Sequence, residues 1–141
     1  MKVKIKKLNP SAKMPKRGTK HAAGFDLYAA EEFDAPIHEE QTVRIQTGLA
    51  FEIPEGYVGM VYSRSSTALK GLIITPLLVD ADYRGPVYVT VKNASGRPYV
   101  LRNGDRIAQM RIEELVPTEF EWADELSETA RGTGGYGSTG D

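Results

Sequence analysis

Residues able to bind an anion occur at two places far apart in this 141-residue sequence. Arg64, Ser65 and Ser66 stand where a strand-like segment gives way to a short helix-like one. The segment RGTGGYGSTG, residues 131–140, is half glycine and carries an arginine and several hydroxyl side chains. Helix N-termini and glycine-rich backbones present N–H groups to anions, and arginine adds a planar fork that fits phosphate oxygens. Both places therefore predict an anion site.

The glycine-rich segment also carries one large ring. Tyr136 offers a flat surface that can cover a nucleobase, and Ser138 and Thr139 add hydroxyl donors. Simpler interpretations remain open at both places, because chain ends of this composition commonly lack fixed structure and a serine can merely cap a helix.

Three further segments carry residues that could do chemistry. Asp80 and Asp82, in VDADYRG, point the same way if they lie on a strand, and one could activate a water or bind a cation; a pair of turn aspartates is the alternative. Gln109 interrupts apolar residues and is either a buried amide that meets a ligand or a solvated residue. Considered by itself, Asp26 in AGFDLYAA is best interpreted as a turn aspartate that stabilises a loop.

Short segments of alternating polarity must position these residues. They cover residues 2–8, 42–53, 86–91 and 106–112, and a period of two predicts half-buried strands. Turn signals separate them at 53–57, 94–98 and 102–105, and the last holds Asn-Gly, which predicts a hairpin. Two segments are helix candidates: 65–71, with a serine cap and a glycine stop, and 122–130, which is weakly helical or an extended acidic linker. The sequence predicts an all-β domain, either a sandwich or a barrel-like jelly roll.

Bulk composition limits the possible partners. The net charge of −1 argues against general binding to nucleic acid or to a membrane surface. Cysteine is absent, which excludes disulfides and thiolate chemistry. We find neither the apolar core of a signal peptide nor a run long enough to span a bilayer, so a cytoplasmic protein is expected, including the nucleus or the cytosol of a virus host.

Five segments in order resemble the five motifs of the trimeric dUTPases: AGFDLYAA, SRSSTALKG, VDADYRG, GDRIAQM and RGTGGYGSTG. The resemblance spans about residues 22–140. It implies a jelly roll, a distorted barrel with one short helix and a flexible glycine-rich tail. Residues 1–128 would form the β domain, and 129–141 a mobile arm that closes over a neighbouring active site. The family is homotrimeric, with active sites shared between chains, and hydrolyses dUTP to dUMP and pyrophosphate with Mg²⁺.

The resemblance also implies roles for individual residues. Asp80 would be the general base for the water that attacks the α-phosphorus, and Tyr83 would stack under the deoxyribose and exclude a ribose. Asp26 would meet Mg²⁺ through coordinated water, with the metal held mainly by the triphosphate. The expected substrate-binding residues are Arg64, Ser65, Ser66, Tyr83, Gln109, Arg131, Tyr136, Gly137, Ser138 and Thr139.

Within that set the roles divide between phosphate and base. Residues 64–66 and Gln109 would bind the phosphate chain, and Arg131 with the hydroxyls of 138–139 would grip the γ-phosphate. Tyr136 takes the place of an aromatic residue that stacks on uracil.

The third motif departs from the family pattern in one respect. Leu77 replaces a glycine three residues before Asp80, and residues 74–76 stand where small or amide residues are common. Glycine permits close approach of a base to the backbone, so a different base preference among deoxynucleoside triphosphates is an alternative. The absence of a glutamate from DADYRGPVYVTVKN argues against a dCTP deaminase. A regulatory protein whose tail orders with nucleotide is a further alternative.

Overall fold

The computed structural model describes residues 1–31 and 35–135, which contain nine strands and one short helix. The elements are β1 (Lys4–Lys7), β2 (Phe25–Tyr28), β3 (Thr42–Gln46), β4 (Leu49–Glu52), β5 (Tyr57–Tyr62), α1 (Ser65–Leu69), β6 (Leu72–Ile74), β7 (Leu77–Val79), β8 (Tyr88–Asn93) and β9 (Arg106–Glu114).

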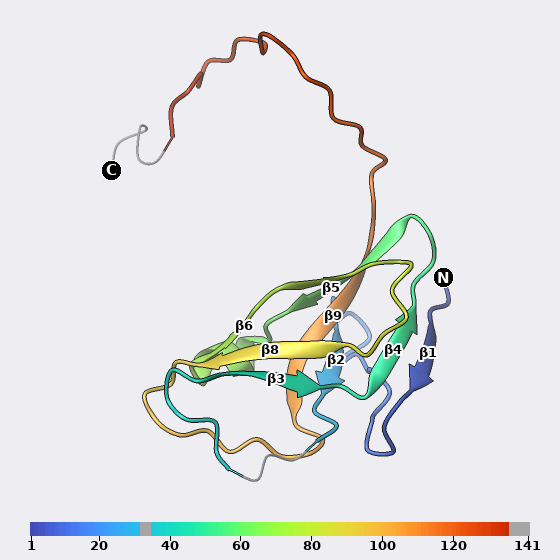
Figure 1. Cartoon of the computed structure of the whole chain (residues 1–141), viewed down its shortest axis with the longest axis vertical. Coiled ribbons are helices and arrows are strands. Elements are labelled where there is room, and N and C mark those ends of the chain that lie inside the picture. The colour runs from blue at the N-terminus through green and yellow to red at the C-terminus, as the bar shows by residue number, and fades with distance from the viewer. Residues whose placement is uncertain (32–34, 136–141) are drawn as a thin grey trace.

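The strands form three antiparallel sheets that wrap around one core (Figure 1). The largest sheet has the order β2-β9-β5-β7, the second has the order β3-β8-β6, and β1 pairs with β4. The predicted all-β class is confirmed, and so is the prediction of a single short helix.

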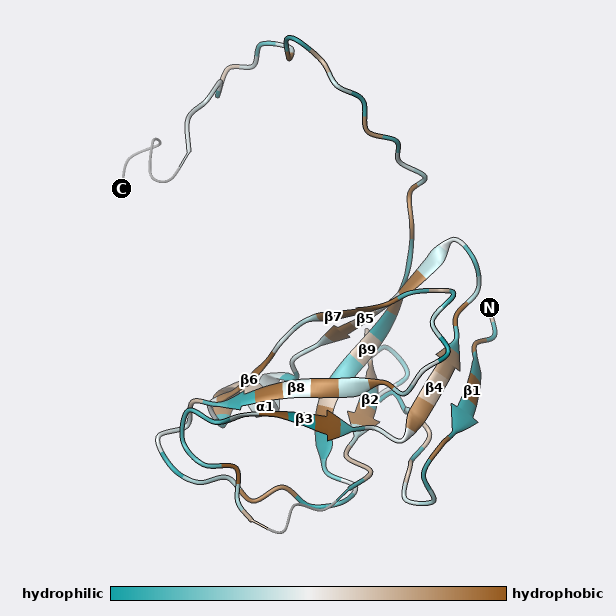
Figure 2. Ribbon diagram, viewed as in Figure 1, coloured by the Kyte–Doolittle hydropathy of each residue, from teal (hydrophilic) through white to brown (hydrophobic). Residues whose placement is uncertain are grey.

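Alternating side chains explain why these segments form strands. On β8, Val89 and Val91 are buried, whereas Tyr88 and Thr90, which alternate with them, face outward. The buried set continues with Leu27 and Val61 on the facing sheet, so the two larger sheets share one apolar core. Figure 2 shows apolar stretches along the strands, and further apolar residues on the chain that follows β9.

The short turn between β6 and β7 connects two different sheets. The two strands are joined only by Thr75 and Pro76, yet β6 pairs with β8 and β7 pairs with β5. Their backbones therefore diverge into different sheets instead of pairing with each other. The N–H of Thr75 donates to the carbonyl of Thr90 at 3.0 Å, which holds the turn against β8.

Two local expectations were wrong. The N-cap of α1 is Arg64, and the predicted serine cap is absent; the Thr67 hydroxyl accepts from the Arg64 N–H at 3.1 Å instead. The Asn103-Gly104 turn forms, with Gly104 at φ 84°, but the segments on its two sides do not pair as a hairpin. The strand before this turn is β8, which ends at Asn93 and belongs to a different sheet from β9. The glycine stop of the helix is confirmed, since Gly71 follows the C-cap at φ 75°.

After β9 the chain leaves the body as an extended segment, residues 115–135, here called the arm (Figure 1). Its apolar side chains have almost no neighbours: Phe120 is 98% exposed and Trp122 is 104% exposed. For residues 122–130 the structure has no helix, so the extended alternative is the correct one. An extended segment with such exposed aromatic side chains is not stabilised by packing against the β domain of the same chain.

Candidate active site in two parts

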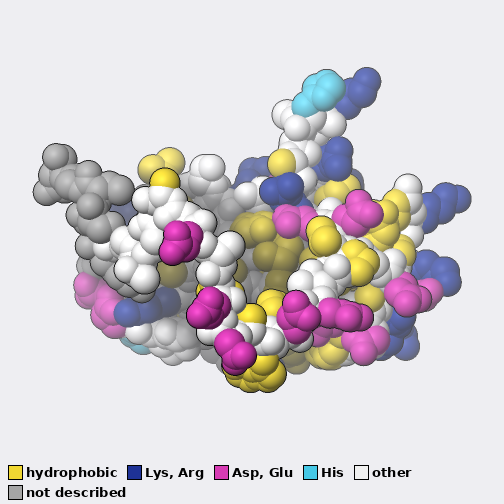
Figure 3. Space-filling view, turned by 90° about the horizontal axis from the view of Figure 1, so that it is seen from above, with side chains coloured by type: hydrophobic (Ala, Val, Ile, Leu, Met, Phe, Trp, Pro, Cys, Tyr) yellow, Lys and Arg dark blue, Asp and Glu magenta, His cyan; other side chains and the backbone are white. Residues whose placement is uncertain are grey.

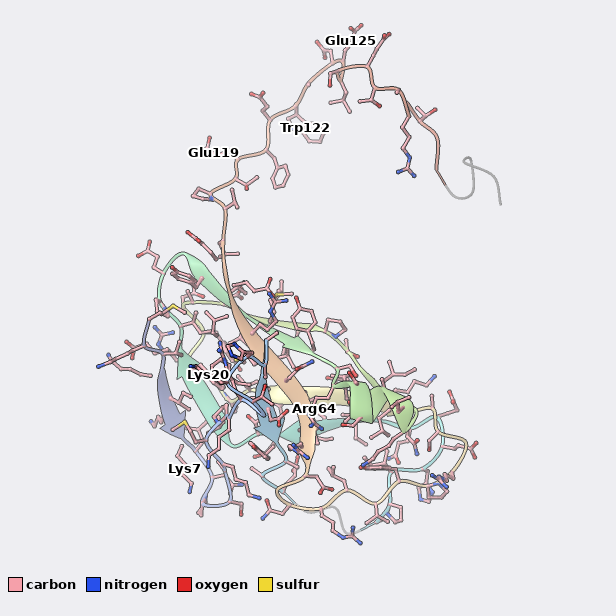
Figure 4. All side chains as sticks on the ribbon, turned by 180° about the vertical axis from the view of Figure 1, so that it is seen from behind. Lys7, Lys20, Arg64, Glu119, Trp122 and Glu125 are labelled. Carbon is pink, nitrogen blue, oxygen red and sulfur yellow. The ribbon has the colours of Figure 1, made fainter. Side chains whose placement is uncertain are left out.

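Three adjacent strands bring the first group of polar side chains together. Asp26 on β2 is the register partner of Gln109 on β9, and Gln109 is in turn the partner of Tyr62 at the end of β5. Because Arg64 follows β5 by two residues, its side chain turns back over the same edge of the sheet (Figure 4). Asp26 therefore lies within a strand, and its interpretation as a turn residue was wrong.

The guanidinium of Arg64 is held on two sides. Its Nε donates to Asp26 Oδ1 at 2.7 Å, and its Nη1 donates to the Ser66 hydroxyl at 2.9 Å. The side chains of Arg64 and Asp26 are only 17% and 12% exposed, so the pair is largely shielded from water. These contacts leave donors of the Arg64 fork available, because a guanidinium carries five N–H groups. We call Asp26, Arg64, Ser65, Ser66, Arg106 and Gln109 the arginine cluster.

Arg106 is a member that the sequence interpretation missed. Its Nη1 lies 3.4 Å from Asp26 Oδ2, so one carboxylate is flanked by two guanidinium groups. The GDRIAQM segment contains Arg106, but only its glutamine was singled out there. Two arginines and one carboxylate leave a net positive charge, which suits an anionic ligand.

Gln109 is a half-buried amide that fixes the backbone beside Arg64. Its Nε2 donates to the carbonyl of Ser63 at 2.8 Å. Gly24 lies against the other end of the amide, because a Cβ there would come within 2.7 Å of Gln109 Oε1. Gln109 is therefore neither fully buried nor simply solvated, and its position keeps the loop before α1 in place.

A cavity of about 430 Å³ forms the second part of the site. Asp80 and Tyr83 line it, together with Leu77 and Leu78. The Tyr83 hydroxyl donates to the carbonyl of Pro86 at 3.1 Å, which fixes the ring at the cavity wall. We call this space the Asp80 cavity.

The two aspartates of VDADYRG do not share a strand face. Asp80 follows the last residue of β7, and Asp82 lies in the turn that comes next. Asp82 does not line the Asp80 cavity, so Asp80 is the carboxylate available to a ligand there.

The arginine cluster and the Asp80 cavity are separate within one chain. None of Arg64, Ser65, Ser66 and Gln109 lines the cavity that Asp80 and Tyr83 line. Arg131 lies further away on the arm, where its Nε donates to the carbonyl of Gly134 at 2.8 Å. Tyr136, Gly137, Ser138 and Thr139 lie outside the described residues.

The described residues contain no group of three or more His, Asp or Glu side chains that could hold a metal ion. Both carboxylate oxygens of Asp26 already accept from arginines. A metal at this site would thus depend on oxygens from the ligand, with Asp26 reached through water.

A neighbouring tyrosine links the end of β5 to β9. The Tyr62 hydroxyl donates to Glu113 Oε1 at 3.2 Å. Burial and the adjacent Glu113 carboxylate raise the pKa of Tyr62 above its ordinary value. The bond ties β5 to β9 two residues before Arg64.

None of the helices that the structure describes has the length and apolar character needed to cross a membrane. The fold defines an all-β protein of the jelly-roll class, in which two arginines flank the Asp26 carboxylate. The sequence model of the dUTPase family matches residues 10–140, and the chain belongs to that family.

Individual relatives agree with this assignment. A deoxyuridine 5'-triphosphate nucleotidohydrolase from Nautilia profundicola is 46% identical over 99% of both chains. A mutant dUTPase of Staphylococcus bacteriophage 80alpha with bound dUpNHpp superimposes with a TM-score of 0.90, at 29% identity over 99% of both chains. A variant of the phage phi11 dUTPase, described for its structural Mg(II) ion, has a TM-score of 0.81 at 27% identity, over 91% of this chain and all of that one.

Proposed function

We propose that this chain hydrolyses dUTP to dUMP and pyrophosphate, with Asp80 as the general base. Asp80 is exposed in a cavity of about 430 Å³, a size in the range of small-molecule sites. Tyr83 presents a fixed ring in the same cavity, a surface on which a deoxyribose can stack. A carboxylate beside the sugar can orient a water toward the innermost phosphorus and accept its proton.

The arginine cluster would bind the phosphate chain. Arg64 is already oriented by Asp26 and Ser66, so little reorganisation is needed when an anion arrives. Mg²⁺, carried on the triphosphate, would neutralise charge on the phosphate oxygens and on the leaving pyrophosphate. Asp26 would contact that ion through water, an arrangement compatible with its two arginine contacts.

A complete site would form between copies of this chain. Attack at the α-phosphorus requires the general base and the phosphate-binding groups to act on one nucleotide, but the cavity of Asp80 contains no member of the arginine cluster. Both requirements are met if the Asp80 cavity of one copy faces the arginine cluster of the next. A closed ring, here a homotrimer, gives every copy the same pair of neighbours.

The arm supports the same arrangement. Residues 115–128 carry five acidic side chains and no lysine or arginine, whereas residues 1–25 carry seven lysines and one arginine but no acid. Figure 3 shows acidic and exposed apolar side chains next to one another on the side from which the arm projects. A second cavity, of about 470 Å³, is lined by apolar residues from the basic N-terminal region, including Met1, Val3 and Phe25. Charge and apolar character therefore complement each other between the arm of one copy and the N-terminal region of another.

Docking of the arm on a second copy would bring its glycine-rich end toward that copy's site. There Arg131 and the residues after it would close over the nucleotide and exclude water, which strengthens the remaining polar contacts. The products could then leave the site only after the arm opens again.

A turnover panel tests the proposed function. The protein is assayed with dUTP, dTTP, dCTP and UTP in the presence of Mg²⁺, and released pyrophosphate is measured. We expect a clear preference for dUTP, and a low rate with UTP because Tyr83 lies against the sugar. Equal rates with all four nucleotides, or no pyrophosphate from dUTP, would refute the proposal.

A further inference from the structure

A lysine lies next to the arginine cluster, at the outer edge of the largest sheet. Lys16 and Asp26 form an antiparallel bridge, in which the N–H of Asp26 donates to the carbonyl of Lys16 at 2.8 Å. The chain at Lys16 therefore continues this sheet by one position beyond β2. The proposed reaction assigns no role to Lys16.

The next two residues along these segments show which way the side chains point. In an antiparallel pair, opposed residues project from the same face of the sheet, and successive residues project from opposite faces. The guanidinium carbon of Arg17 lies 4.7 Å from the centre of the Phe25 ring, so Arg17 and Phe25 share one face. Both line the apolar cavity of about 470 Å³. The side chains of Lys16 and Asp26 therefore project from the other face of the sheet.

That other face is the one on which the arginine cluster is built. The bridge and the strand register give one row of opposed residues across the sheet: Lys16, Asp26, Gln109 and Tyr62. The Cβ atoms of opposed residues are about 5 Å apart, so the long side chain of Lys16 begins beside Asp26 and can reach over the cluster. Lys16 thus extends the arginine cluster on the side of Asp26 that is opposite Gln109.

The carboxylate of Asp26 is neutralised without Lys16. Its two oxygens accept from Arg64 and Arg106, and exposed Lys16 forms no ion pair with any carboxylate in residues 1–31 and 35–135. Lys16 and the two arginines bring three positive charges to one carboxylate. An excess of positive charge on one face of a sheet suits a ligand with several negative charges.

We propose that Lys16 is a further phosphate-binding residue of the nucleotide site. Its ammonium group is a compact charge on a flexible stem and can follow the oxygens of a phosphate chain, whereas the guanidinium of Arg64 is fixed and directional. The position of Lys16 lengthens the cluster along the row, which suits an extended triphosphate. This proposal rests on the proposed function, which assigns the phosphate chain to the arginine cluster.

The test separates binding from the chemical step. We expect Lys16→Ala to raise KM for dUTP about fivefold and to leave kcat within about twofold, because one phosphate contact is lost while the general base is intact. Affinity for dUpNHpp, measured by calorimetry, should fall by a similar factor. Lys16→Arg keeps the positive charge and should restore most of this affinity. Lys7→Ala is the matched control, since Lys7 is an exposed lysine on β1, in another sheet and away from Arg64 (Figure 4).

Three results would overturn the role of Lys16. If KM and affinity for dUpNHpp stay within about twofold of the wild type in Lys16→Ala, Lys16 is an ordinary solvated lysine. An equal loss in Lys7→Ala would indicate long-range attraction by the basic N-terminal region, without a specific contact. Dissociation of the oligomer in Lys16→Ala, measured by analytical ultracentrifugation, would indicate a role between copies. A wild type that binds dUpNHpp through Lys16 but releases no pyrophosphate from dUTP would instead refute the proposed hydrolysis and leave phosphate binding by Lys16 standing.

Discussion

Replacing Asp26 with asparagine tests how the arginine cluster is organised. The substitution keeps the shape of the side chain and one oxygen acceptor, but it removes the charge between Arg64 and Arg106. Breaking a buried ion pair costs about 3–5 kcal/mol when a charge is left without a partner. Because the amide can still accept one hydrogen bond and Arg106 is 55% exposed, we expect a loss of about 1–3 kcal/mol in the free energy of unfolding.

Two assays measure the consequence. For a chain of this length, that loss corresponds to a fall in Tm of roughly 3–10 °C. We also expect kcat/KM for dUTP to fall roughly tenfold, because Arg64 is no longer held in one orientation. Glu52→Gln serves as the control, since its ion pair with Lys4 lies on the surface and its loss should change neither Tm nor kcat/KM appreciably.

A double-mutant cycle decides whether Asp26 acts through Arg64. In an Arg64→Ala background, adding Asp26→Asn should lower kcat/KM by clearly less than tenfold, because the main group that Asp26 positions is already gone. A full tenfold loss in both backgrounds would refute the positioning role. The water-mediated contact with Mg²⁺ proposed above would then be the main contribution of Asp26 to turnover.

Three further outcomes are expected. Asp80→Asn should abolish turnover while nucleotide binding, measured by calorimetry, stays within about tenfold, since the base is lost but the phosphate contacts remain; activity within about threefold of the wild type would exclude Asp80 as the base. Deletion of residues 131–141 should leave Tm unchanged and strongly reduce hydrolysis, and unfolding of the truncated protein would show that this segment is structural instead. Trp122→Ser should weaken association between copies, measured by analytical ultracentrifugation, with more dissociation at high salt because the arm is acidic; Leu69→Ser, an exposed apolar residue on α1, is the control.

The strands were predictable because each has one buried and one outward face. On β8, the alternation of Val89 and Val91 with Tyr88 and Thr90 is visible in the sequence and is repeated in the burial of the side chains. Which strands pair was not predictable in the same way. Asn103 and Gly104 specify a tight turn locally, but whether the flanking segments pair with each other is decided by the distant strands that compete for them.

The candidate site was predictable only in part. Residue types and local spacing indicated Arg64, Gln109 and Asp80, but they did not predict the contacts that these residues make. The pair between Asp26 and Arg64 joins residues 38 positions apart, and it exists because β2 and β5 both flank β9. The place of Lys16 beside Asp26 likewise depends on the bridge between these two residues, which no local pattern contains.

In the proposed oligomer, each active site combines the Asp80 cavity of one chain with the arginine cluster of another. Mixing two variants, Asp80→Asn and Arg64→Ala, tests it most directly, because each should be nearly inactive alone. Co-expressed or refolded together, they should form mixed oligomers in which about a quarter of the sites combine an intact Asp80 with an intact Arg64. Recovery of activity toward that fraction supports a shared site, whereas a mixture no more active than its two components would contradict it.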